Sequence, residues 1–193
     1  MTDPIKIIKY ENESLHFRTT AGSHIPLLRK ISGFFDINVV AEFGTGIYSV
    51  KTFLDKKYFP KLINLYSYET SEIWGNYIKS FFDDNRWKMH FIGSQKESIN
   101  KVDLPQNVDL IFVDGLDIQR EPLIIKYSNL YNIFVLHDCD ADFLMPLVNK
   151  FRYKYIYAPP VPKYRHTVIL SNKTDVSHMK WDIVWEEDFL KWI

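Results

Sequence analysis

The feature that most constrains the fold is a repeated alternation of apolar runs with amphipathic stretches. Five apolar runs cover residues 37–43, 62–68, 87–92, 108–113 and 132–136. Each run is followed by a stretch that has apolar residues at helical spacing or that ends in a turn. Short continuous apolar runs are typical of parallel strands that are covered on both faces. Strands that alternate with helices predict an α/β fold, with helices on both faces of a mostly parallel sheet.

The expected helices cover residues 23–35, 47–57, 71–82, 97–102, 122–130 and 141–151. The clearest of them follows Ser71, with apolar residues at helical offsets as far as Phe82. Pro122 suits the first turn of its helix. Two further strands, 153–157 and 166–170, are joined by a link too short for a crossover helix, so we expect an antiparallel hairpin. The complete pattern predicts a doubly wound, seven-stranded sheet with this hairpin at its C-terminal end.

Length and composition limit the class of protein. The 193 residues favour a single domain, which we divide into an N-terminal cap and helix (1–35), a Rossmann-like core (36–171) and an aromatic tail (172–193). Lys+Arg and Asp+Glu both number 24, which argues against a large nucleic-acid surface. The single cysteine, Cys139, excludes an internal disulfide and fits a reducing compartment. No apolar run approaches the roughly 18 residues of a membrane span, so we expect a soluble cytoplasmic protein with no membrane partner.

Polar residues and glycines gather where the expected strands end. An acid or a serine follows each of the five runs: Glu42, Glu69, Ser94, Asp114 and Asp138. Four of the seven glycines lie at the same strand ends: Gly44, Gly46, Gly93 and Gly115. Such residues also end strands for structural reasons alone. Because ligands bind outside the carboxyl ends of strands in open parallel sheets, five successive cases predict one binding edge.

Three residues near the first two strand ends indicate the cofactor. Glu42 precedes the glycine turn, where a carboxylate would repel a pyrophosphate and attract a cationic amine. Ser49 replaces the third glycine of the dinucleotide pattern G-x-G-x-x-G, which argues against NAD. Glu69 can accept hydrogen bonds from both hydroxyls of a ribose. S-adenosylmethionine has an amino-acid end, a ribose and no phosphate, so it agrees with all three observations.

The same residues resemble the motifs of class I S-adenosylmethionine-dependent methyltransferases. Glu42-Phe43-Gly44-Thr45-Gly46 is similar to the first motif of that family, an acid followed by G-x-G. Glu69 resembles the acid that ends the second strand, and Phe112-Val113-Asp114-Gly115 resembles the fourth-strand motif. The likeness covers about residues 23–171 and departs from many members at Tyr131-Asn132, where they have a glycine pair.

The resemblance implies a set of cofactor-binding residues: Glu42, Gly44, Thr45, Gly46, Glu69, Thr70, Ser94, Asp114 and Gly115. By this likeness Glu42 approaches the amino group of the cofactor and Glu69 holds its ribose. The glycine turn packs against the methionine and ribose portion, while Thr70 and Ser94 flank the adenine. Asp114 faces the methyl donor and the acceptor.

Methyl transfer to a hydroxyl or amine requires that the acceptor be oriented and lose a proton. We assign these tasks to His137, Asp114 and Asp138, with His137 as the candidate base, because an ordinary imidazole has a pKa of about 6.5. The alternative is a histidine that only caps its strand. Asp114, Asp138 and Asp140 also suit Mg²⁺, although Asp138 or Asp140 equally suits the N-cap of the next helix, and we assign no metal site. His24 receives no role.

Two C-terminal features leave alternatives open. Four aromatic residues recur at helical spacing in the tail: Trp181, Trp185, Phe189 and Trp192. We expect this stripe to pack on the sheet or its hairpin, and the alternative is a homodimer contact. Basic and aromatic side chains alternate in residues 150–155. This pattern is consistent with a contact to nucleic acid and equally with an ordinary strand that has one solvated face.

The sequence thus predicts an S-adenosylmethionine-dependent methyltransferase that acts on a hydroxyl or amine of a small molecule or sugar. One alternative is a catalytically silent scaffold that still binds the cofactor. A nucleic-acid or protein acceptor is another, and a nicotinamide-dependent oxidoreductase is a third.

Overall fold

The sheet has seven strands in the order β3-β2-β1-β4-β5-β7-β6. It is described by a computed structural model that covers residues 22–139, 144–160 and 164–185. The first five strands pair in parallel, and β7 runs antiparallel to both β5 and β6. The expected sheet, mostly parallel with an antiparallel hairpin at its C-terminal end, is therefore confirmed.

Every strand lies within two residues of its expected bounds. The strands are β1 (Val39–Phe43), β2 (Asn64–Glu69), β3 (Trp87–Phe91), β4 (Leu110–Val113), β5 (Ile133–His137), β6 (Tyr153–Tyr157) and β7 (Thr167–Ser171). The helices are α3 (Ile25–Ile31), α4 (Ile47–Leu54), α5 (Glu72–Lys79), α6 (Asp117–Tyr127) and α7 (Met145–Val148), with the 3-10 helix η1 (Lys96–Lys101). In the described part of the chain, none of these helices is long and apolar enough to cross a membrane.

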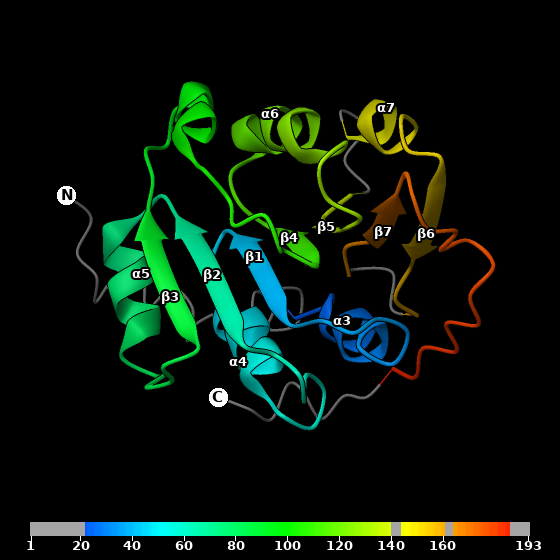
Figure 1. Cartoon of the computed structure of the whole chain (residues 1–193), viewed down its shortest axis with the longest axis horizontal. Helices are drawn as coiled ribbons and strands as arrows, with labels where there is room; N and C mark the ends of the chain where they lie inside the picture. The colour runs from blue at the N-terminus through cyan, green and yellow to red at the C-terminus, as the bar shows by residue number, and fades with distance from the viewer. Residues whose placement is uncertain (1–21, 140–143, 161–163, 186–193) are drawn as a thin grey trace.

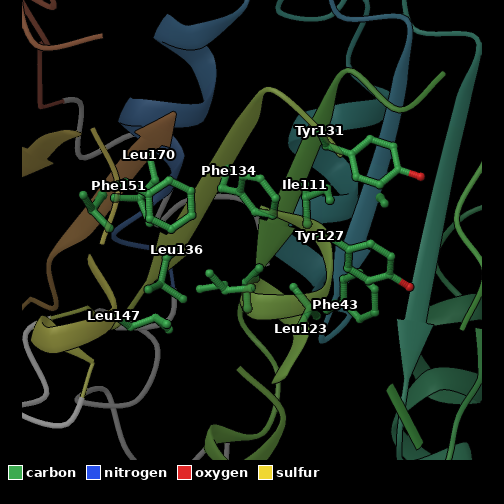
Figure 2. Packing of buried hydrophobic residues seen from close by; sticks show 14 of the residues in the cluster. Phe43, Ile111, Leu123, Tyr127, Tyr131, Phe134, Leu136, Leu147, Phe151 and Leu170 are labelled. Carbon is green, nitrogen blue, oxygen red and sulfur yellow. The ribbon is translucent and has the colours of Figure 1, made fainter. Parts of the chain in front are cut away.

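Two apolar cores lie on opposite faces of the sheet, because side chains alternate along each strand. η1, α6 and α7 cover one face, where Figure 2 shows Phe43, Ile111 and Phe134 packed among residues of α6 and α7. α3, α4 and α5 cover the other face, and Figure 1 shows α3 and α4 on the side away from α6 and α7. With helices on both sides, β1, β4, β5 and β7 are buried along their whole length.

Most of the helices differ from expectation: α3 ends at Ile31 instead of near residue 35, and α4 ends at Leu54 instead of near residue 57. α6 begins at Asp117 and contains Pro122 in its interior, so the expected start at Pro122 is wrong; the acidic Asp117 complements the positive end of the helix dipole. α5 ends at Lys79, which leaves Phe81 about half exposed (51%) instead of buried on the helix. α7 is a four-residue helix, and the start of the expected helix 141–151, like Asp140, lies outside the described residues.

The aromatic tail packs on the sheet without forming a helix over its described part. Residues 181–185 have no regular secondary structure, so the expected helical stripe is wrong there, and Phe189 and Trp192 lie outside the described residues. The buried Trp181 ring lies 4.6 Å from the ring of Phe34 and stacks at 5.1 Å on Tyr155, measured between ring centroids. Trp181 thus belongs to the core on the α3 face, in agreement with the packing interpretation of the tail.

Candidate functional site

The order of the strands reverses at one place, between β1 and β4. These strands are neighbours in the sheet although β2 and β3 separate them in the sequence. In a doubly wound sheet, a crevice for ligands opens outside the carboxyl ends of the strands at such a reversal. Glu42, Glu69, Asp114, His137 and Asp138 all lie at this end of β1, β2, β4 and β5.

Two glycines bring the turns after β1 and β4 into backbone contact. Gly44 has φ of +86°, a conformation that favours glycine, and a Cβ atom built there would lie 2.5 Å from the Cα of Gly115. The amide of Asp114 also donates to the carbonyl of Phe43 at 2.8 Å. No larger residue fits at position 44, so the sequence has glycine there for a physical reason.

The glycine turn is held by Glu69 and Trp74. One Glu69 oxygen, Oε2, accepts the amide of Thr45 at 3.0 Å. The other, Oε1, accepts the amides of Thr70 at 2.7 Å and Ser71 at 2.8 Å. The indole N–H of Trp74 donates to the carbonyl of Thr45 at 2.6 Å. A carboxylate has about four acceptor positions, and Oε2 accepts a single bond from the described residues, which leaves one position for a ligand hydroxyl.

Glu42 is fully buried beneath the same turn. Its Oε2 accepts the hydroxyl of Ser67, whereas its Oε1 has no hydrogen-bond partner in the described part of the chain. Burial raises the pKa of Glu42 from 4.5 to about 8, and the hydrogen bond from Ser67 opposes that rise. Without a cation beside it, Glu42 is therefore mostly protonated at neutral pH.

The ends of β4 and β5 meet through His137 and Asp114. His137 Nδ1 lies 2.9 Å from Asp114 Oδ1. Burial by itself lowers the pKa of His137, but the charge of Asp114 and the hydrogen bond to it outweigh burial and raise that pKa. Burial tends to raise the pKa of Asp114, but His137, His24 and Arg120 together lower it. Both shifts favour the charged forms, an imidazolium beside a carboxylate.

The second nitrogen of His137 is also engaged. Nε2 lies 2.8 Å from the hydroxyl of Ser23, and that hydroxyl donates to the carbonyl of Arg165 at 3.2 Å. Ser23, His137 and Asp114 have the spacing of a hydrolytic triad. However, Ser23 is fully buried and its proton points to a carbonyl, so no substrate reaches it. The hydrogen bonds from Ser23 to His137 and from His137 to Asp114 instead fix the position of Asp114.

The sequence did not indicate a role for two residues of this region, Arg120 and His24. Arg120 of α6 donates to the carbonyls of His137 at 2.6 Å and Gly115 at 2.9 Å, and so ties the ends of β5 and β4 together. His24, just before α3, is buried with its ring centroid 4.7 Å from that of His137. Burial, with a smaller effect from His137, lowers the pKa of His24 to about 3, so it is neutral.

Two other predicted site residues, Asp138 and Ser94, lie at the periphery of this site. Asp138 has φ of +55° and places Oδ1 3.5 Å from His137 Nε2; burial is the main cause that raises its pKa. Ser94 is exposed on the loop between β3 and η1. The side chain of Gln119, which the sequence did not single out, donates to the carbonyls of Gly93 at 2.7 Å and Gln95 at 3.0 Å and so fixes that loop.

No protein-family model and no curated protein matches this chain. Solved structures do match it. The O-methyltransferase TomG from Streptomyces achromogenes, solved with S-adenosylmethionine, is 16% identical with a TM-score of 0.58, over 78% of this chain and 79% of that one. The precorrin-6y C5,15-methyltransferase of Geobacter metallireducens is 14% identical with a TM-score of 0.57, over 75% of this chain and 86% of that one. This chain has the class I methyltransferase fold.

The class I methyltransferase fold also occurs in a protein named for a different reaction. The spermidine synthase of Thermotoga maritima is 15% identical to this chain with a TM-score of 0.54, over 79% of this chain and 57% of that one. The fold by itself therefore does not determine which group is transferred, and that depends on the residues of the site.

Proposed function

We propose that this protein is an S-adenosylmethionine-dependent methyltransferase that acts on a hydroxyl or amine of a small molecule or sugar. The observation that supports it most is the buried carboxyl of Glu42, which has an unpartnered Oε1 under the turn where Gly44 meets Gly115. A buried carboxyl without a cation favours a positively charged ligand group. The ammonium of S-adenosylmethionine is such a group.

The other polar groups of the turn agree with this cofactor. Glu69 keeps one acceptor position on Oε2 for a ribose hydroxyl. Thr45 has a buried hydroxyl oxygen without a hydrogen-bond partner among the described residues. Residues 44–49 include no Lys or Arg to neutralise a pyrophosphate, which argues against a dinucleotide. When bound, S-adenosylmethionine supplies an electrophilic methyl group on a sulfonium.

In this proposal Asp114 contacts the acceptor and His137 positions Asp114. The side chain of Asp114 is 25% exposed, whereas that of His137 is 4% exposed and bonded through both nitrogens. Asp114 therefore accepts the hydrogen bond that orients the acceptor hydroxyl or amine for in-line attack, and its carboxylate is placed to receive the proton. Asp138, 40% exposed, lies beside it as a second acceptor contact.

Calorimetry with S-adenosylhomocysteine tests the cofactor site. We expect the wild-type chain to bind it and not to bind NAD. Glu69→Ala should abolish binding, because it removes the ribose acceptor and releases three backbone amides. Glu69→Gln should weaken binding less, since one oxygen remains. Glu72→Ala, at the exposed first residue of α5, is the matched control and should bind like the wild type.

Circular dichroism separates loss of binding from loss of folding in these variants. Unchanged affinity in a folded Glu69→Ala chain would refute the ribose assignment. Tighter binding of NAD than of S-adenosylhomocysteine would refute the proposed cofactor.

A further inference from the structure

We infer that His24, Asp114 and His137 form a binding site for a divalent transition-metal ion of the zinc class. Binding of the ion does not depend on methyl transfer. Because Asp114 belongs to the proposed acceptor side, a role for the ion beside the acceptor rests on the proposed function. The Mg²⁺ alternative that the sequence left open, with Asp114, Asp138 and Asp140 as ligands, shares only Asp114 with this set.

The three side chains converge in space. One ligand atom from each lies within 4.8 Å of the other two. His137 Nδ1 and Asp114 Oδ1 are 2.9 Å apart. Two ligand atoms that each lie about 2.1 Å from one ion are separated by about 3.4 Å at the tetrahedral angle that zinc prefers. Small rotations of the side chains therefore bring all three atoms to one ion.

His24 supplies the observation that points to a ligand. Both of its ring nitrogens are buried, and neither has a hydrogen-bond partner among the residues that the structure describes. A buried polar nitrogen without a partner is unfavourable, and native proteins rarely retain one. The ring is packed against Phe112 at 5.0 Å and His137 at 4.7 Å between centroids, so it is held in place beside His137. A metal ion gives one of these nitrogens its partner.

The surroundings of His137 suit a metal ligand. Metal-binding histidines usually donate their second ring N–H to an oxygen, which fixes the tautomer and the ring orientation. His137 Nε2 has such a partner in the hydroxyl of Ser23, which is bonded in turn to the carbonyl of Arg165. Nδ1, which faces Asp114, is then the nitrogen that binds the ion. Arg120 lies 3.8 Å from Asp114, and its positive charge is also paired with Asp117, 3.3 Å away.

The ligand types select the ion. Imidazole nitrogens favour zinc, iron, cobalt and nickel, whereas Mg²⁺ prefers a shell made of oxygen. Two histidines and one carboxylate leave open coordination positions, as in catalytic metal sites. The partly exposed side of Asp114 is where water or an acceptor oxygen would reach such a position.

Cobalt titration of the full chain tests the site. Protein treated with a chelator is titrated with Co²⁺, and the visible absorption of bound cobalt is followed before and after Zn²⁺ is added. We expect one ion per chain, displaced by Zn²⁺ and not by Mg²⁺. His24→Gln should weaken binding by more than about tenfold, since even the loss of a residue behind a ligand costs 10- to 100-fold.

The matched control is His178→Gln. His178 lies 3.7 Å from Asp175, and its side chain is 85% exposed, so it represents adventitious binding by a surface histidine and carboxylate. This variant should bind Co²⁺ like the wild type. Equal weakening in both variants, or binding that neither variant changes, would overturn the inference.

A measurement on the wild-type chain covers the case in which His24→Gln does not fold. NMR spectra of the histidine ring nitrogens are recorded with and without Zn²⁺. We expect the signals of His24 and His137 to shift and those of His178 to stay. An unchanged His24 signal at saturating Zn²⁺ would refute the site. Binding of S-adenosylhomocysteine, measured on the same sample, reports separately on the proposed methyltransferase function.

Discussion

The two halves of the ligand-binding edge are built in different ways. At the ends of β1 and β2, a carboxylate acts on backbone amides, and Glu69 and Thr45 are 24 positions apart in the sequence. At the ends of β4 and β5, side chains act on one another, and Ser23 reaches His137 across 114 positions. The first half is a local motif, while the second exists only after the N-terminal segment packs on the sheet.

The acids in the two halves also differ in charge. Burial raises the pKa of Glu42 to about 8, so it is mostly neutral at pH 7. Asp114, at the end of the adjacent strand, has a lowered pKa because His137, His24 and Arg120 offset its burial. A cation supplied by a ligand would offset the charge of Glu42 in the first half, whereas in the second half His137 and Arg120 already favour the carboxylate form of Asp114.

The largest effect on stability should come from the backbone contact between Gly44 and Gly115, which joins the two halves. Gly44→Ala places a Cβ 2.5 Å from the Gly115 backbone at a positive φ, so we expect a loss of ~3 kcal/mol or more in the free energy of unfolding. Urea denaturation measures it. Gly46→Ala, where the Cβ meets only the movable Ser49 hydroxyl at 3.2 Å, should cost clearly less. Equal losses would show that the contact between the turns is not tight.

The next effect is specific to the β4–β5 half. Arg120→Ala leaves two strand-end carbonyls and the mostly buried Asp114 without their cation, which should destabilise the chain by about 3 kcal/mol. Binding of S-adenosylhomocysteine to the folded variant should stay within about threefold of the wild type, because Arg120 does not contact the glycine turn. A large loss of cofactor affinity would show that the two halves are not separable.

An effect on stability that depends on pH is expected for Glu42. Its pKa is 4.5 when exposed and about 8 in the folded chain, so between these values the folded state holds a proton that the unfolded state has lost. Stability from this group is complete below pH 4.5 and falls as pH rises toward 8, by up to about 1.4 kcal/mol per pH unit. Glu42→Gln should lack this slope in denaturation series, and the exposed Glu72→Gln should retain it.

The same group links cofactor binding to pH. An ammonium beside Glu42 lowers its pKa, so binding releases a proton, and the affinity for S-adenosylhomocysteine should rise as pH approaches 8. In Glu42→Gln the affinity should not vary in this way. A pH-dependent rise that persists in the variant would assign the proton to another group.

The smallest effect should follow from Trp74→Phe. This change removes the hydrogen bond to the carbonyl of Thr45 and keeps most of the aromatic contact, so we expect a loss of about 1 kcal/mol in stability. Cofactor affinity, measured by calorimetry, should fall a few-fold. Trp181→Phe removes a comparable bond, to the carbonyl of Val176, and is the control for the loss of an indole N–H.

The sheet could be predicted because buried parallel strands leave continuous apolar runs in the sequence. The glycine turn could be predicted because its parts are close in sequence and only glycine fits at Gly44. His24 and Arg120 could not, since their roles come from contacts between separate elements. The helix expected at Trp181 is wrong. Helical spacing of aromatic residues does not distinguish a helix from an irregular tail, in which Trp181 packs against the rings of Phe34 and Tyr155.

The backbone contact between Gly44 and Gly115 has a mechanical consequence. Gly115 directly follows Asp114, whose amide is bonded to Phe43, so the two turns cannot be displaced independently. A molecule that presses on the first turn must also move the backbone of Asp114. The positions of the two turns are thereby tied together through the main chain.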